Sequence, residues 1–239
     1  MKLIKIKKNK QYNLVVLSNP PANTFNIDLL NDLCVIMKSV NNDKPLLITG
    51  EGKIFSAGID LFIANELSKK DFKNLIVSFE SFLIQIINHK GPTYTILNGP
   101  AIAGGFILSI TTDYCYSNNV NYKVGLNQNI TRLSLPSVPQ SLLKTKYEND
   151  YQKFWEIKQI IEFDFNNRIY QFAKNPLKEI IKKIENFDNS FYEQKEKKQI
   201  KILNHIKING KNYNNEFFRQ WWLDETVKLR EKEVKNLKT

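Results

Sequence analysis

Short apolar segments alternate with amphipathic ones between residues 12 and 117, and this alternation constrains the fold more than any other feature. Apolar runs of four to eight residues that end in turn residues indicate buried strands, and apolar stripes at helical spacing indicate helices. A first strand is expected over Met1–Lys8, where apolar and charged residues alternate. The other predicted strands are Tyr12–Ser18, Leu46–Thr49, Tyr94–Leu97 and Tyr114–Ser117, and the predicted helices are Asp28–Val40, Asp71–Asn88 and Gly104–Thr112. This order is typical of an α/β architecture with right-handed crossovers.

The pattern changes after Pro139, where long charged helices are expected and no strand is evident. The predicted helices cover Asp150–Ile161, Pro176–Asn186 and Glu216–Leu237. No repeat or low-complexity linker separates the two parts. We therefore expect an α/β core over residues 1–140 and a C-terminal helical region over 141–239, which packs on the core or on a neighbouring subunit as part of the same structural unit.

Composition excludes several classes of protein. No apolar run approaches the roughly 20 residues of a membrane-spanning helix, so an integral membrane protein is not expected. Two cysteines, Cys34 and Cys115, are too few for a disulfide scaffold or a cysteine-based zinc site. His89 and His205 are too sparse for a histidine metal cluster, so no metal is expected. His89 follows an amphipathic helix and is predicted to be a surface or capping residue.

The net charge of +11 invites a nucleic-acid or anionic-ligand interpretation. Lysines are scattered along the whole chain, so we favour a solvated surface over a nucleic-acid footprint. A small polyanionic ligand would be attracted to the same surface. No secretory, transit or peroxisomal signal is evident, so a cytoplasmic location is expected, with an organellar matrix left open.

Glycine is unevenly distributed. The chain has nine, where average usage predicts about 17, and eight of them lie between Gly50 and Gly125. A scarce glycine indicates a backbone need, such as a positive φ or a close approach to a ligand. The functional site is therefore expected in the middle third of the chain.

Two segments in that third place small residues at a strand-to-helix junction, Phe55–Leu61 and Asn98–Gly105. Backbone N–H groups at such junctions are unpaired and point outward. Two junctions that face each other can aim two N–H donors at one oxygen, which is an oxyanion hole made only of backbone. Spacing alone leaves two ordinary tight turns equally open.

The same segments carry a resemblance to the crotonase (enoyl-CoA hydratase/isomerase) superfamily, and within it to the mitochondrial-type Δ3,Δ2-enoyl-CoA isomerases. The matching motifs are F-S-A-G-I-D-L at 55–61, N-G-x-x-x-A-G-G at 98–105, D-Y at 113–114 and G-L-N at 125–127. Asn19–Asn23 fits the first loop of the family, and Trp221–Lys238 resembles its C-terminal helix. The resemblance is good over about residues 10–140 and moderate over the last twenty, whereas the stretch from about 145 to 210 departs from it.

The resemblance implies a crotonase-type spiral of ββα units, closed by C-terminal helices and assembled as a homotrimer. It implies an acyl-CoA substrate, with no cofactor beyond the CoA that the substrate carries, no metal and no membrane partner. The thioester oxygen would lie between the backbone N–H groups of Ile59 and Gly104. The substrate-binding residues that the resemblance implies are Ser56, Ala57, Gly58, Ile59, Asp60, Ala103, Gly104 and Asn127.

The catalytic base departs from the family pattern. Ile107 stands where hydratases carry a glutamate, three residues after the oxyanion glycine. Gln128 stands where isomerases carry the glutamate of G-L-N-E, and Pro136 keeps the isomerase-like spacing. A carboxamide cannot shuttle a proton as a carboxylate does. We therefore expect Gln128 to occupy the base position without acting as a base.

Three interpretations stay open, and the first is an isomerase-like enzyme in which another carboxylate, Asp60 or Glu66, reaches the substrate. Asp60 is expected to cap the following helix, however, and Glu66 to face solvent. The second is base-independent chemistry such as decarboxylation of a malonyl-type thioester, with Gln128 holding the departing carboxylate or the thioester through its N–H groups. The third is a non-catalytic module that binds acyl-CoA or RNA. The aromatic residues Phe217, Phe218, Trp221 and Trp222 are expected to pack within the chain or in a trimer interface.

Overall fold

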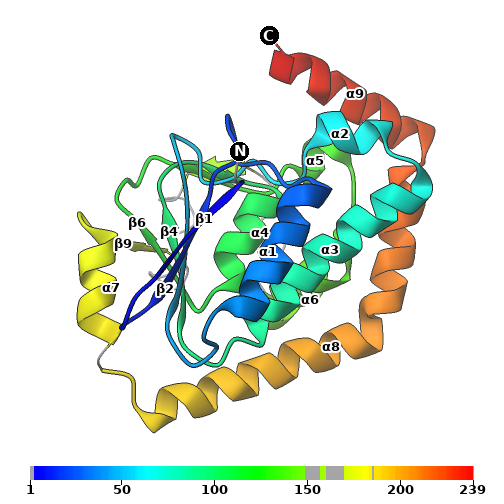
Figure 1. Cartoon of the computed structure of the whole chain (residues 1–239). Coiled ribbons are helices and arrows are strands. Elements are labelled where there is room, and N and C mark those ends of the chain that lie inside the picture. The colour runs from blue at the N-terminus through cyan, green and yellow to red at the C-terminus, as the bar shows by residue number, and fades with distance from the viewer. Residues whose placement is uncertain (1–2, 149–156, 160–169, 185, 239) are drawn as a thin grey trace.

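The computed structural model describes residues 3–148, 157–159, 170–184 and 186–238 (Figure 1). Its larger sheet has six strands in the order β1-β2-β3-β4-β6-β9. These strands are β1 Ile4–Lys8, β2 Asn13–Leu17, β3 Leu46–Gly50, β4 Thr93–Leu97, β6 Tyr114–Ser117 and β9 Tyr170–Phe172. The β1–β2 pair is antiparallel, and every other neighbouring pair is parallel. The carboxyl ends of β3 and β4 therefore lie side by side.

A second, three-stranded sheet begins just after the carboxyl end of β4. It consists of β5 Ala101–Ile102, β7 Lys123–Gly125 and β8 Ile157–Gln159, in the order β5-β7-β8. The β5–β7 pair is parallel and the β7–β8 pair is antiparallel. Strands of two or three residues are too short to show a period-two pattern, so none of these three was expected from the sequence.

Helices cover both faces of the larger sheet. Figure 1 shows α1, α3, α4 and α6 on one side and α7 on the other, with α8 running beneath the core and turning up towards α9. The helices are α1 Ile27–Ser39, α2 Leu61–Glu66, α3 Lys69–Ile87, α4 Gly104–Thr111, α5 Gln128–Thr131, α6 Ser137–Tyr147, α7 Pro176–Ile184, α8 Asn189–Trp221 and α9 Asp224–Lys238. Within the described residues, every helix is too short or too polar to cross a lipid bilayer.

The main core lies between the larger sheet and the helices α1, α3 and α4. It is filled by the apolar stripes that the sequence shows, for example Leu29, Leu33, Phe72 and Phe79, all of them buried. Burial of such side chains is the dominant stabilising contribution, at roughly 1.5–3 kcal/mol for each. A smaller core under α7 contains Tyr94, Tyr116 and Ile180.

Side-chain caps set where three of the helices begin. The side chain of Asn26 accepts a hydrogen bond from Leu29 N at the start of α1, and that of Ser68 accepts one from Asp71 N at the start of α3. Asp60 caps α2 in the same way, as the sequence predicts. Such caps satisfy backbone N–H groups that have no partner inside the helix. The predicted strands and helices between residues 12 and 117 are confirmed to within one or two residues.

The expectation that no strand follows Pro139 is wrong, because β8 and β9 lie beyond it. The parallel edge of β6 is completed by β9, a long-range pairing that local sequence does not encode. The helix predicted over 150–161 is also wrong at 157–159, which form β8, and its other residues lie outside the described ones. The helix predicted over 176–186 is confirmed as α7.

The single helix predicted over 216–237 is wrong, because the chain turns at Trp222 and Leu223 between α8 and α9. Asp224 and Glu225 in the first turn of α9 favour a new helix start there, since acidic side chains stabilise the positive end of a helix. The prediction also missed residues 189–215 of α8. Their apolar positions are few, and the helix is stabilised by packing along α6.

The prediction that His89 is a surface or capping residue is wrong as well. Its side chain is fully buried, and its Nε2 atom lies 2.7 Å from the backbone oxygen of Lys44. Burial lowers the pKa of the imidazole. The segment after α3 is covered by α8, whose Gln199 donates to the backbone oxygen of His89 at 3.2 Å. Gln199 and His89 are 110 positions apart in the chain, so this contact cannot be inferred from local sequence.

Candidate functional site

The two strand-to-helix junctions meet at the carboxyl ends of β3 and β4. Ser56 and Ala101 form a parallel bridge, and Ile102 N donates to Ser56 O at 3.0 Å. Asn98 adds a side-chain link, because its Oδ1 atom accepts from Gly50 N at 3.0 Å. These bonds hold the Phe55–Leu61 segment against the start of α4.

The backbone nitrogens of Ile59 and Gly104 are close together. A methyl group on Gly104 would lie 3.4 Å from Ile59 N and 3.2 Å from the Cα atom of Gly58. Given standard backbone bond lengths, the two nitrogens are no more than about 6 Å apart. That separation lets one oxygen atom accept from both N–H groups, since each bond needs about 2.9 Å.

The N–H groups of Ile59 and Gly104 take no part in the hydrogen bonds that join the neighbouring described segments. On either side of Ile59, Gly58 O accepts from Phe25 N at 2.7 Å and Asp60 N donates to Phe25 O at 3.0 Å, so the two segments bond through the residues that flank Ile59. Gly104 is the first residue of α4, where an N–H has no partner inside the helix. Within the described part of the chain, neither N–H donates to a protein acceptor.

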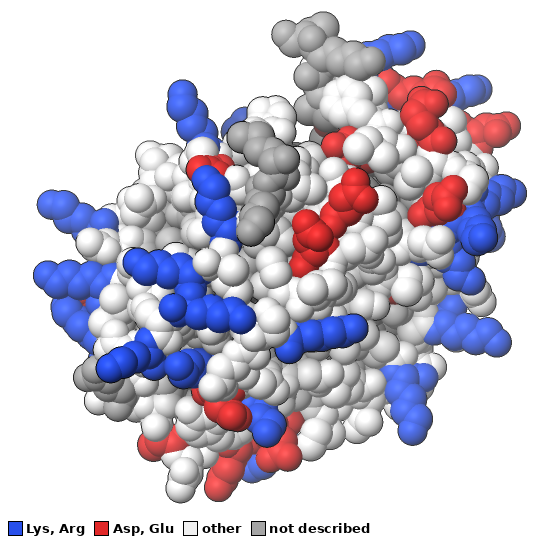
Figure 2. Space-filling model, viewed as in Figure 1, with Lys and Arg blue, Asp and Glu red and all other residues white. Residues whose placement is uncertain are grey.

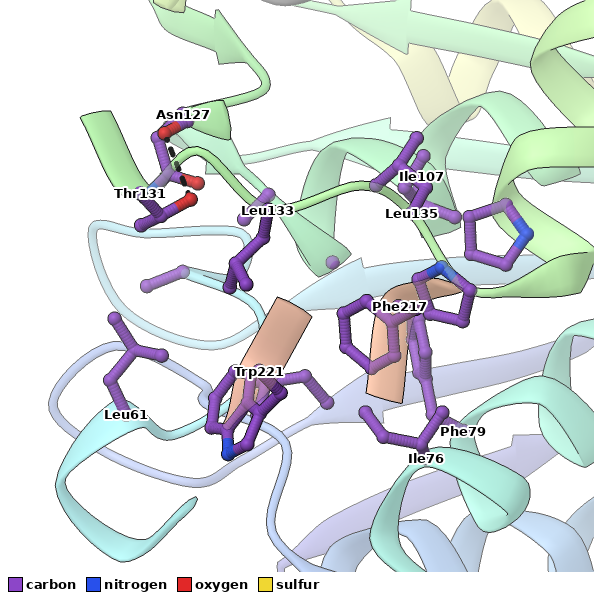
Figure 3. Close-up of a pocket in the computed structure, with 16 residues that line it drawn as sticks. Leu61, Ile76, Phe79, Ile107, Asn127, Thr131, Leu133, Leu135, Phe217 and Trp221 are labelled. Carbon is purple, nitrogen blue, oxygen red and sulfur yellow. Dashed lines mark hydrogen bonds between the residues drawn. The ribbon is translucent and has the colours of Figure 1, made fainter. Parts of the chain in front are cut away.

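Ile59 and Gly104 both line a cavity of about 100 Å³. We call it the acyl cavity, and its lining is largely apolar. The larger apolar side chains on its walls are Leu61, Ile76, Phe79, Ile107, Leu133 and Leu135, together with Phe217 and Trp221. Figure 3 shows Asn127 and Thr131 on one side of this cavity and the aromatic residues of α8 away from them. Among the described side chains of the lining, Asn127 and Thr131 alone are polar.

The structure brings five of the predicted site residues onto this cavity: Ala57, Ile59, Ala103, Gly104 and Asn127. Gly58 lies directly beside Gly104. Gln128 is the first residue of α5, directly after Asn127, and its side chain lies outside the described part of the structure.

Two predicted residues serve the fold rather than the cavity. Ser56 is fully buried and donates to Asn23 O at 2.7 Å, while its oxygen accepts from Gly58 N. The Asp60 carboxylate accepts from Phe62 N, Ile63 N and the hydroxyl of Thr24. Both side chains hold the loop that presents Ile59.

Helix α4 has a lysine at its C-terminal end and no side-chain cap at its N-terminal end. Its N-terminus faces the acyl cavity, preceded by Ala103 with a φ of 50°. At its other end, the Lys146 ammonium donates to Ile110 O at 2.6 Å and to Thr112 O at 2.8 Å. Burial lowers the pKa of Lys146 to about 8. A cation at the C-terminus and an anion at the N-terminus both suit the helix dipole, so the cavity end of α4 favours negative charge.

The sequence did not place the aromatic wall of the acyl cavity. Phe217 and Trp221 are buried, and Trp221 stacks on Phe72 with 3.9 Å between ring centres. Their packing within the chain confirms one of the two expectations for the aromatic cluster, and Phe218 and Trp222 are half-buried. The adjacent tryptophans indicate a buried aromatic cluster, but Phe72 is far from them in the sequence, so the sequence does not identify it as the ring on which Trp221 stacks.

The model of the enoyl-CoA hydratase/isomerase family matches residues 7–134. Mouse mitochondrial enoyl-CoA delta isomerase 1 is 26% identical over 125 residues, which cover 50% of this chain and 43% of the mouse protein. The human protein of the same name is 26% identical over 115 residues, which cover 46% of this chain and 38% of the human protein. The matched segments thus span less than half of these two relatives.

Solved structures match over nearly the whole chain. The human mitochondrial delta3-delta2-enoyl-CoA isomerase superposes with a TM-score of 0.86 and 17% identity, covering 99% of this chain and 98% of that one. An enoyl-CoA hydratase from Bacillus halodurans superposes with a TM-score of 0.81 and 16% identity. The match covers 97% of this chain and 100% of that one. The expected crotonase fold is therefore confirmed. The family model matches more than half of the chain, so the chain belongs to the enoyl-CoA hydratase/isomerase family.

Proposed function

We propose that the chain binds an acyl-CoA thioester and stabilises its enolate, in the manner of a Δ3,Δ2-enoyl-CoA isomerase. The thioester oxygen accepts hydrogen bonds from Ile59 N and Gly104 N, and the acyl chain enters the acyl cavity. The observation that carries this proposal is that Ile59 and Gly104, whose N–H groups lie close together with no acceptor among the described residues, both line a largely apolar cavity. Donors aimed at a developing oxyanion in a water-poor site are a large catalytic contribution.

The CoA part is a polyanion, and the surface suits it. Figure 2 shows Lys and Arg side chains mainly on the left half and along the right edge of one face, with acidic side chains near its upper centre, upper right and lower edge. The net charge of the whole chain is +11. Such a surface raises the association rate of an anionic ligand in a salt-dependent way.

Isomerisation needs a proton to leave one carbon and return to another, and Gln128 limits this step. In the position of the family's glutamate, a carboxamide neither accepts nor delivers the proton. The described polar side chains of the acyl cavity, Asn127 and Thr131, do not titrate either. We therefore propose weak 3-enoyl to 2-enoyl isomerisation in the chain as it stands.

Decarboxylation is the second candidate, favoured by the neutral polar side chains of the cavity. In a malonyl-type thioester, the bond between the α-carbon and the carboxylate breaks, and its electron pair forms the enolate. Carbon dioxide leaves, and the α-carbon then takes a proton from water. This reaction needs the oxyanion hole but no protein base.

The test compares wild type with Gln128→Glu on 3-enoyl-CoA and on malonyl-type CoA esters. Gln194→Glu, which adds the same charge at an exposed position on α8, is the control. We expect Gln128→Glu to raise isomerisation by roughly a hundred- to ten-thousand-fold and the control to leave it unchanged. Brisk isomerisation by wild type would show that another base exists. Decarboxylation alone would select the second candidate, and binding without turnover would leave a binding module.

We also propose that the chain forms a homotrimer with its terminal helices at the interface. The proposal rests on likeness to the family, and light scattering tests it. A monodisperse monomer at assay concentrations would contradict it.

A further inference from the structure

A second hollow is lined by residues that follow lining residues of the acyl cavity in sequence, Phe62 after Leu61 and Trp222 after Trp221. This hollow, of about 620 Å³, lies between α2 and α9, and we call it the α2–α9 groove. Its lining is mixed. The apolar lining residues are Phe62, Trp222, Val227 and Val234, and the polar and charged ones are Asn65, Glu66, Arg230, Glu231 and Lys235. Trp221 lines the acyl cavity and not the groove, whereas Arg230 lines the groove and not the cavity.

Trp221 and Arg230 stack on one another between the two hollows. The Arg230 guanidinium carbon lies 3.8 Å from the centre of the indole, and the Phe72 ring centre lies 3.9 Å from it. The guanidinium and the phenyl ring are both less than 4 Å from the centre of the indole, so they cannot lie on the same face of it. Each therefore covers one face of the indole. In Figure 3 the indole lies along the side of the acyl cavity away from Asn127 and Thr131.

Arg230 is itself held firmly. It is 2% exposed, and its Nε atom donates to Asn65 Oδ1 at 3.0 Å. Its Nη1 atom donates to the backbone oxygen of Trp221 at 2.8 Å. The side chain thus joins α2, α9 and the last residue of α8. An indole stacked between a fixed guanidinium and a buried phenyl ring cannot swing aside without breaking both contacts.

We propose that the Trp221–Arg230 stack is the wall that limits acyl-chain length, and that it makes short-chain acyl-CoA thioesters the substrate class. The inference rests on the proposed function. A cavity of about 100 Å³ is small beside the 300–1,000 Å³ of ordinary ligand pockets. Trp221 acts as the specificity-determining residue, and Arg230 is a positioning residue that acts through it. Without the indole, the acyl cavity opens into the α2–α9 groove, which has room for a longer chain.

The test measures binding of CoA and of acetyl-, butyryl-, octanoyl- and decanoyl-CoA by calorimetry on the full chain. In wild type, affinity rises about fourfold for each methylene from acetyl- to butyryl-CoA and stops rising by octanoyl-CoA. In Trp221→Ala, the rise continues, and decanoyl-CoA binds at least about tenfold more tightly than to wild type. Acetyl-CoA binds within about twofold of wild type in both proteins.

Trp222→Ala is the matched control, because it removes the same side chain from the neighbouring position and enlarges only the groove. We expect its chain-length profile to equal that of wild type. Trp221→Leu keeps an apolar filler and serves if Trp221→Ala does not fold. Arg230→Met tests positioning: relaxed chain-length selection supports it, whereas a lower Tm with an unchanged profile assigns Arg230 a purely structural role.

Failure of the inference and failure of the proposed function give different results. If neither CoA nor acetyl-CoA binds, the proposed function fails. If both bind but wild-type affinity keeps rising through decanoyl-CoA, the chain-length wall is refuted. Equal profiles for Trp221→Ala and Trp222→Ala would refute it too.

Discussion

A methyl group on Gly58 would lie only 2.5 Å from the backbone nitrogen of Gly104. Gly58 also has a φ of +85°, a conformation that other residues adopt at a cost. A hydrogen atom at this position therefore serves two needs, the turn of the loop and the space in front of Gly104 N. A β-carbon at Gly58 would press on Gly104 N, one of the two proposed oxyanion donors.

Gly58→Ala is expected to abolish the proposed oxyanion site. Thioester turnover should fall by at least about a hundred- to a thousand-fold, the usual effect of removing one oxyanion donor. Stability should fall by roughly 1–2 kcal/mol from the positive φ, with a further loss from the clash. Steady-state kinetics on acyl-CoA substrates and urea unfolding check the two effects.

Gly52→Ala separates strain from site chemistry. Gly52 has a φ of +81°, but a methyl group there would meet no atom within 4 Å. This variant should lose similar stability to the positive φ while keeping wild-type turnover. Equal losses of turnover in the two variants would refute an oxyanion role for Gly104 N.

Asp60→Asn should leave activity nearly unchanged. Asp60 is occupied as the cap of α2 and as the acceptor for Thr24, and asparagine caps a helix about as well. We expect turnover within about twofold and stability within about 1 kcal/mol of the parent, both in wild type and in the Gln128→Glu background. A fall of a hundredfold or more in kcat would instead identify Asp60 as a base.

Lys146 should make stability depend on pH in the alkaline range. Its pKa is about 8 in the folded protein, against an ordinary value of 10.5. Between these values the unfolded chain binds more protons, so the free energy of unfolding rises with pH from about 8 to 10.5. The rise from this group is at most about 3 kcal/mol. Four nearby groups also act on the pKa of Lys146: Asp113 and Cys115 raise it, and Lys195 and Lys198 lower it.

Urea unfolding across that pH range checks the prediction in wild type, Lys146→Met and Lys197→Met. Lys146→Met should flatten the rise, and Lys197→Met, an exposed position on α8, should keep it. Burial also lowers the pKa of Lys195, so the contribution of that group to the rise remains in every variant. Identical slopes in all three proteins would show that Lys146 titrates normally.

Glu80 should contribute strongly to the start of α6. It is buried, and its Oε1 atom accepts from Ser137 Oγ at 2.8 Å and Val138 N at 2.7 Å. Its Oε2 atom accepts from Asn214 of α8 at 3.2 Å. Glu80→Ala leaves these donors without an acceptor, so a loss of about 1–3 kcal/mol is expected. In chemical denaturation, Glu196→Ala at an exposed position should change stability by less than about 0.5 kcal/mol.

The sequence specified the elements whose signals are local. The stripe of Asp71–Asn88, the cap at Asp60 and the turn at Gly50–Gly52 each depend on residues a few positions apart. For the same reason the two glycine junctions were visible, and their resemblance to a known family suggested that Ile59 and Gly104 meet. The closeness of those two nitrogens follows from the parallel pairing of β3 and β4.

Tertiary structure decided whatever depends on contacts between distant segments. The edge strand β9 and the burial of His89 follow from packing and left no periodic signal. The wall of the acyl cavity is the clearest case, because Trp221 is held between Phe72 and Arg230. Local propensity arises from near neighbours along the chain, whereas the shape of a cavity is set by side chains that meet only after the chain has folded.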